Sequence, residues 1–107
     1  MNNLDDRKNA FESKFAHDQE IMFKIEARCC KLFGLWMAEQ LGLTGDDATV
    51  YAGGVVAANL DEPGFDDVVR HVMPDITAKG LDISEHMVET QLQTFFAQAE
   101  EQIANEA

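Results

Sequence analysis

Two adjacent cysteines and three scattered histidines are the residues of this chain that could bind a metal or act as nucleophiles. A disulfide between Cys29 and Cys30 is geometrically unfavourable, because they are neighbours in a segment of helical composition. The zinc-binding spacings CxxC and HxxxH do not occur, and His17, His71 and His86 match no other ligand pattern. We predict no metal site, with Cys29 a core residue and Cys30 an incidental thiol.

No motif in the chain is typical of an enzyme active site. Ser13 and Ser84 lack the glycine-rich elbow and preceding strand that surround a hydrolase nucleophile. Neither a Walker loop nor a GxGxxG motif is found. The acidic pairs fall at expected helix starts, where carboxylates favour the helix dipole, or on solvated faces: Asp46-Asp47, Asp61-Glu62, Asp66-Asp67 and Glu100-Glu101. We therefore predict a protein that is not an enzyme and has no catalytic residues.

The net charge of −12 is unevenly distributed along the 107 residues. Residues 1–31 hold six basic and six acidic side chains, whereas residues 32–107 hold two basic against fourteen acidic ones. Such an acidic body repels nucleic acid and anionic membrane surfaces. The chain also has no secretory signal and no apolar run near the ~18 residues of a membrane span. We expect a cytoplasmic protein without nucleic acid partners or membrane insertion.

Apolar periodicity predicts helices separated by short breaks that contain glycine. The breaks are "LGLTG" (41–45), "DEPG" (61–64) and "KGLDIS" (79–84). From residue 21 onward each stretch between them has one apolar face at helical spacing, and no strand alternation competes. The expected fold class is all-α, a small four-helix bundle with a mobile or frayed N-terminal helical segment.

Some residues inside these helices disfavour helical structure. Gly53 and Gly54 each cost about 1 kcal/mol relative to alanine. Close packing against a neighbour or a local break would explain them, and the sequence leaves both open. Pro74 predicts a kink or an early end of the third helix. The last helix is expected to begin at Ser84 or at Asp82.

The opening 18 residues have a helical composition but only three apolar residues at helical spacing: Leu4, Phe11 and Phe15. Burying each returns about 1.5–3 kcal/mol, whereas ordering the segment costs about 1–2 kcal/mol per residue in backbone entropy. We predict that residues 1–18 are frayed or mobile in the free protein and that residues 19–107 form the bundle domain. Two aromatics four residues apart favour a segment that folds on a partner, and a floppy tail is the alternative.

Several motifs in the chain match those of a known family. They are "DDR" (5–7), "AFESKFAHDQE" (10–20), "FKIEAR" (23–28), "KLFGLWMAEQLGLTGDDA" (31–48) and "SEH" (84–86). In these motifs the chain resembles the zeta-subunit family of bacterial F-type ATP synthase inhibitors. The resemblance implies a bundle whose N-terminal segment inserts as a helix at a catalytic α/β interface of the ATPase head, against the γ subunit. There it would block rotary ATP hydrolysis and permit synthesis.

The resemblance also implies a partner-binding site in the opening segment, for the α, β and γ subunits. Its residues are Leu4, Asp5, Arg7, Lys8, Phe11, Lys14, Phe15, His17 and Asp18. The apolar residues would anchor the segment on the enzyme, and the basic ones would pair with acids there. His17 and Asp18 would lie at the hinge between segment and bundle, and "GLW" (34–36) would pack within the bundle.

The resemblance further implies a location peripheral to the inner membrane, reached through the ATP synthase. We expect a monomer when free and no cofactor, although the family is associated with weak binding of ATP or ADP. A nucleotide-responsive helical binding protein without inhibitory activity is the alternative function. A redox sensor based on Cys29 and Cys30 is a third hypothesis. These cysteines stand where the family often has an Arg-Asn pair, which predicts weaker inhibition than that of a strong member.

Overall fold

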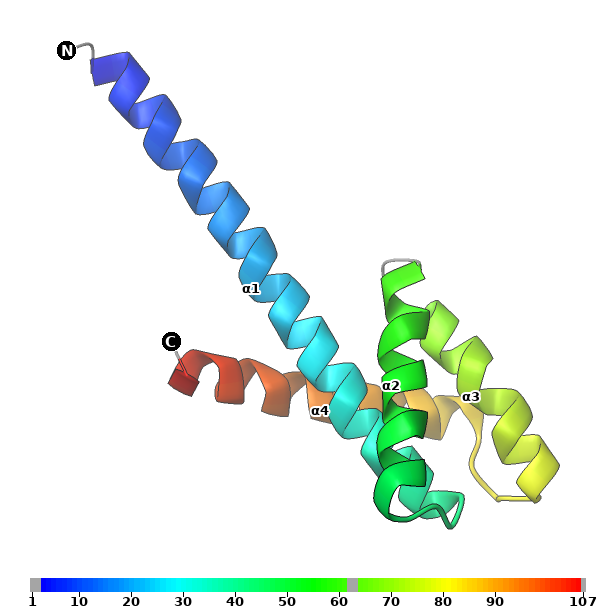
Figure 1. The fold of residues 1–107 in the computed structure, drawn as a ribbon. Coiled ribbons are helices and arrows are strands. Elements are labelled where there is room, and N and C mark those ends of the chain that lie inside the picture. The colour runs from blue at the N-terminus through cyan, green and yellow to red at the C-terminus, as the bar shows by residue number, and fades with distance from the viewer. Residues whose placement is uncertain (1–2, 62–63, 107) are drawn as a thin grey trace.

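The computed structural model describes residues 3–61 and 64–106, with side chains described for residues 18–60 and 64–106. These ranges contain α1 (Asn3–Gln40), α2 (Gly45–Asp61), α3 (Asp66–Lys79) and α4 (Glu85–Glu106), and no strand (Figure 1). The predicted all-α class with four helices is confirmed. No helix in the described part of the chain is both long enough and apolar enough to cross a bilayer.

The long helix α1 organises the molecule. Its C-terminal half packs against both α2 and α4, whereas α3 packs mainly against α2 (Figure 1). Its N-terminal half extends beyond the other three helices, and this extension accounts for the elongated extents of 65 × 24 × 20 Å. The structure is therefore a compact bundle with one projecting helix.

The core lies where the four helices meet. Its largest fully buried side chains come from all four helices: Phe33, Met37, Val55, Val68, Val72, Ile76, Val88 and Leu92. On α1, Asp18, Gln19 and Glu20 are exposed, and Ile21 is the first described side chain that packs against this core. Burial of these apolar side chains supplies the main driving force for folding.

Both adjacent cysteines belong to the core. Cys29 and Cys30 are fully buried, and the thiol of Cys29 donates a hydrogen bond to the carbonyl of Leu92 at 3.4 Å. The prediction for Cys29 is confirmed, whereas the prediction that Cys30 is an incidental thiol is wrong. Neighbouring residues are both buried because α1 has α2 and α4 packed against it. Burial raises the pKa of both thiols to about 12, so they stay protonated and unreactive, which argues against the redox hypothesis.

The closest approach of two helix backbones at a glycine occurs at Gly34 of α1, not at the paired glycines of α2. A Cβ atom added at Gly34 would lie 2.7 Å from the Cα atom of Ala52. By contrast, nothing lies within 4 Å of a Cβ placed at Gly53, and a Cβ at Gly54 would meet the His71 ring at 3.6 Å. Helix α2 runs through both glycines unbroken. Neither close packing nor a break therefore explains them.

The helix ends follow ordinary capping chemistry. Gly42 and Gly80 adopt positive φ angles of 80° and 70°, and each N–H bonds back to the preceding helix, as expected of glycine stops. Ser84 is the N-cap of α4, because its hydroxyl accepts a hydrogen bond from the N–H of Met87 at 3.1 Å. Pro74 lies inside α3, which continues past it as far as Gly80, so the predicted early end is wrong.

Candidate functional site

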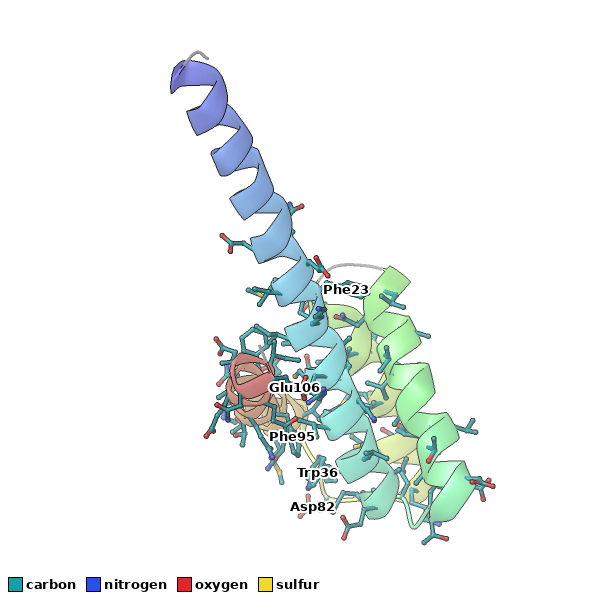
Figure 2. All side chains as sticks on the ribbon, turned by 60° about the vertical axis from the view of Figure 1, so that its left-hand side comes forward. Phe23, Trp36, Asp82, Phe95 and Glu106 are labelled. Atoms are coloured by element: carbon teal, nitrogen blue, oxygen red, sulfur yellow. The ribbon has the colours of Figure 1, made fainter. Side chains whose placement is uncertain are left out.

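The candidate site is the part of α1 that precedes the bundle. We call residues 3–20 the projecting segment. Its backbone is helical and continuous with the packed part of α1, and no other helix lies beside the N-terminal half of α1 in either view (Figures 1 and 2). At 1.5 Å per residue, 18 helical residues reach about 27 Å, which is close to the diameter of a small domain.

The sequence-predicted site residues all fall on this one helix. The side chain of Asp18 is described and is exposed. The others lie outside the residues with described side chains: Leu4, Asp5, Arg7, Lys8, Phe11, Lys14, Phe15 and His17. At 3.6 residues per turn, positions 4, 11 and 15 fall on one side of a helix. Whether residues 1–18 are frayed in the free protein stays a prediction.

The projecting segment leaves the bundle at residues 21–24. Ile21 is half-buried, whereas Met22 and Phe23 are 47% and 56% exposed. Apolar spacing predicts a core-facing stripe on this helix formed by Met22, Ile25, Cys29, Leu32 and Trp36. For Met22 this prediction is wrong, because its side chain is exposed. Phe23 lies where α1 begins to rise clear of the bundle (Figure 2), so few neighbours are available to cover side chains at this level. Lys24 forms an exposed ion pair with Glu20 at 3.5 Å, one helical turn earlier.

An ion pair connects the C-terminal end of α4 to Arg28 of α1, one helical turn after Lys24. The Nη1 atom of Arg28 lies 2.8 Å from Oε1 of Glu106 and donates to Oε1 of Gln102 at 2.8 Å. The Nη2 atom of Arg28 donates to Oε2 of Glu106 at 3.1 Å, which makes the pair bidentate. Sequence reasoning missed this contact, because no local pattern relates residues that are 78 positions apart.

Comparison with known proteins decides the family. The family model for ATPase inhibitor subunit zeta matches residues 1–102, which include the whole projecting segment. The chain belongs to the ATPase inhibitor subunit zeta family. One similar protein has a structure solved by solution NMR and is 41% identical in sequence. The match spans 81% of this chain and 99% of that protein, with a TM-score of 0.70. No curated protein matches the chain.

Membership of the zeta family places the protein among regulatory inhibitor subunits and associates it with ATP synthase. Within the described side chains, no group of three or more histidine, cysteine, aspartate or glutamate residues could hold a metal ion. The most prominent feature of this zeta-family protein is an extended helix with a packed bundle at its base.

Part of the family motif "GLW" supports the base of that helix. Gly34 packs against α2, and the ring of Trp36 lies 5.8 Å from that of Phe33 and 6.4 Å from that of Phe95 on α4 (Figure 2). Aromatic pairs at these separations contribute beyond their buried area. Packing of Gly34 and Trp36 in the bundle is confirmed. For Leu35 the expectation is wrong, because its side chain is 38% exposed.

We expect the attachment of the α4 end to α1 to weaken at acidic pH. The hydrogen bond from Arg28 holds the pKa of the Glu106 carboxyl below its ordinary value. A carboxyl whose pKa is lower in the folded state than in the unfolded state stabilises the fold when the pH is above its unfolded-state pKa. This stabilisation is lost as the pH falls through its folded-state pKa. The contact should therefore open only when the pH falls below the ordinary titration range of a glutamate.

An NMR titration of the Glu106 carboxyl carbon measures this effect. In Arg28→Gln the Glu106 pKa should rise towards its ordinary value. The matched variant Lys24→Gln should raise it less, because Lys24 acts on Glu106 only through its charge. Equal Glu106 pKa values in the wild type and Arg28→Gln would show that Arg28 does not lower this pKa.

Proposed function

We propose that this protein is an inhibitory subunit of a bacterial F-type ATP synthase. In this proposal the projecting segment blocks rotary ATP hydrolysis at the catalytic interface of the α, β and γ subunits. The observation that carries the proposal is the continuity of α1 from the packed bundle into the projecting segment. The proposed location is cytoplasmic and peripheral to the membrane, and the proposed free form is a monomer.

The physical argument concerns the transmission of force. An element that stops a rotating subunit must resist displacement, and a flexible tether cannot do so. In α1 the same helix that would enter the enzyme is held further along by Phe33 and Met37, both fully buried in the core. A load on the inserted segment would therefore be carried by the packed bundle.

The distribution of charge supports the same arrangement. Residues 1–31 are neutral overall, whereas residues 32–107 carry the whole net charge of −12. Within residues 1–31 the projecting segment holds three basic and five acidic side chains, a net charge of −2, so an acidic protein surface would repel it less than it repels the bundle. The acidic bundle is better suited to stay in solvent outside the interface. We therefore propose that contact begins at the N-terminal end of α1.

The test is ATP hydrolysis by the cognate ATPase head, with the full-length protein and with a version that starts at Gln19. We expect inhibition by the full-length protein and none by the shorter one. Because the described core begins at Ile21, the shorter version should keep the helical circular dichroism signal and cooperative melting of the bundle. If neither version inhibits while the full-length protein still binds the head, the blocking role is wrong.

The alternative is a nucleotide-responsive bundle without inhibitory activity. One hollow of ≈ 430 Å³ is lined by three cations, Lys24, Arg28 and Lys31. Because the phosphates of a nucleotide need cationic partners, this hollow favours the alternative. The charge of Arg28 is already balanced by Glu106, however, and this weakens the case. Titrating ATP while following backbone amide shifts decides the question, because only this alternative requires saturable shifts at physiological nucleotide concentration.

A further inference from the structure

Three of the five basic side chains in the described part of the chain line a single surface on α1. This surface, which we call the root face, consists of Phe23, Lys24, Ala27, Arg28 and Lys31. It follows directly after the projecting segment on the same helix. The remaining two described basic residues lie elsewhere, on α3.

The root face borders a hollow that is lined by both apolar and charged side chains. Val56 of α2 and Ile103 of α4 flank it on either side, and the hollow has a volume of ≈ 430 Å³. The side chain of Phe23 is 56% exposed, so much of its ring contacts solvent. The root face therefore presents a large aromatic side chain and an arginine, two residue types that are enriched in protein interfaces.

The charge of the root face contrasts with that of the rest of the bundle. Its three cations are opposed by two carboxylates, because Glu106 pairs with Arg28 and Glu20 with Lys24. The ammonium group of Lys31 leaves a positive excess. By comparison, residues 32–107 carry a net charge of −12. An acidic partner would be repelled by most of the bundle and attracted to this face.

We propose that the root face is a second docking surface for the ATPase head, which receives an acidic segment carrying an apolar side chain. The identity of the partner rests on the function proposed above. The apolar side chain would cover the ring of Phe23, and the acidic groups would lie near Lys31 and Lys24. With the projecting segment inserted, the root of α1 is the part of the bundle nearest to the enzyme, so contact here extends the same interface.

The test compares full-length variants that differ only in where the change is made. Phe23→Ser is matched by Val50→Ser, because Val50 is an apolar side chain of α2 that is 73% exposed. Lys31→Glu is matched by Lys79→Glu, an exposed basic residue on α3, and both changes take the net charge from −12 to −14. The affinity for the cognate head is measured by a binding assay without ATP hydrolysis, and inhibition is measured separately.

We expect Phe23→Ser and Lys31→Glu each to weaken the affinity about tenfold, mainly through faster dissociation. The Val50 and Lys79 controls should change it by less than about twofold. Inhibition at saturating protein should be unchanged, since the projecting segment is intact. Raising the salt concentration should weaken binding of the wild type more than that of Lys31→Glu.

The outcomes separate this proposal from the proposed function. Binding without inhibition by the wild type, weakened by the root-face variants, keeps the docking surface and rejects the blocking role. The docking surface is overturned if the wild type does not bind the head, or if the root-face variants bind like their controls. It is also overturned if ATP gives saturable shifts at Ala27 and Lys31 while these variants bind the head normally, which would assign the face to a small anion.

Discussion

Gly34→Ala is expected to destabilise the bundle by about 2 kcal/mol, whereas the same substitution at Gly53 should stabilise it by about 1 kcal/mol. The new methyl group at Gly34 would lie 2.7 Å from the Cα of Ala52 and 3.1 Å from its Cβ. Because the nearest atom belongs to the backbone, no side-chain rotation can relieve the overlap. Helices α1 and α2 would have to move apart, which disturbs the packing of neighbouring core side chains.

The comparison of the two glycines separates packing from helix propensity. Alanine is favoured over glycine by about 1 kcal/mol in a helix interior, and this gain applies at both positions. At Gly53 nothing opposes the gain, because a Cβ there meets no atom within 4 Å. The melting temperatures of the two variants should differ by roughly 12–24 °C, since their stabilities differ by about 3 kcal/mol and about 1 kcal/mol shifts the melting temperature of a small domain by about 4–8 °C.

A second substitution tests the cause of the loss at Gly34. Ala52→Gly removes the more distant of the two contacts and leaves the Cα in place. We therefore expect Gly34→Ala combined with Ala52→Gly to recover little of the lost stability. Full recovery would show that the Ala52 methyl group, not the backbone, sets the distance between the helices. Equal melting temperatures for Gly34→Ala and the wild type would contradict the close approach itself.

The fold could be predicted from the sequence because its strongest signals are local. Apolar residues at helical spacing specify the four helices, and glycine specifies their ends at Gly42 and Gly80. Periodicity does not predict how many other helices pack against each helix. Helix α1 is covered by α2 and α4 along part of its length, so Cys30 is buried beside Cys29. Where α1 projects, the same apolar pattern leaves Met22 exposed.

Only part of the candidate site could be predicted from the sequence. The sequence predicts a partner-binding segment over residues 1–18, because they combine a helical composition with few apolar residues to bury in their own protein. The contact between Arg28 and Glu106 joins the first helix to the last, and no spacing rule could have indicated it. The root face likewise depends on three helices meeting, since Phe23 and Val56 lie on different helices. Surfaces assembled from distant residues become visible only in the folded chain.

Phe11→Ala combined with Phe15→Ala is expected to raise the protein concentration needed for half-maximal inhibition by roughly 100- to 1,000-fold. Aromatic side chains that fill pockets at interfaces often cost about 2 kcal/mol or more each when truncated, and 1.4 kcal/mol corresponds to a factor of ten. The measurement is ATP hydrolysis by the cognate head as a function of inhibitor concentration. The melting temperature should not change, since the described core contacts begin at Ile21.

A matched control removes apolar side chains outside the projecting segment. Val50→Ala combined with Leu60→Ala truncates residues of α2 that are 73% and 55% exposed, and inhibition should stay within about twofold of the wild type. Helix propensity cannot produce the expected loss, because alanine favours the helix more than phenylalanine does by several tenths of a kcal/mol per residue. The double alanine variant would have a better-formed segment without its anchors. If it inhibits like the wild type, the segment is a tail and inhibition resides in the bundle.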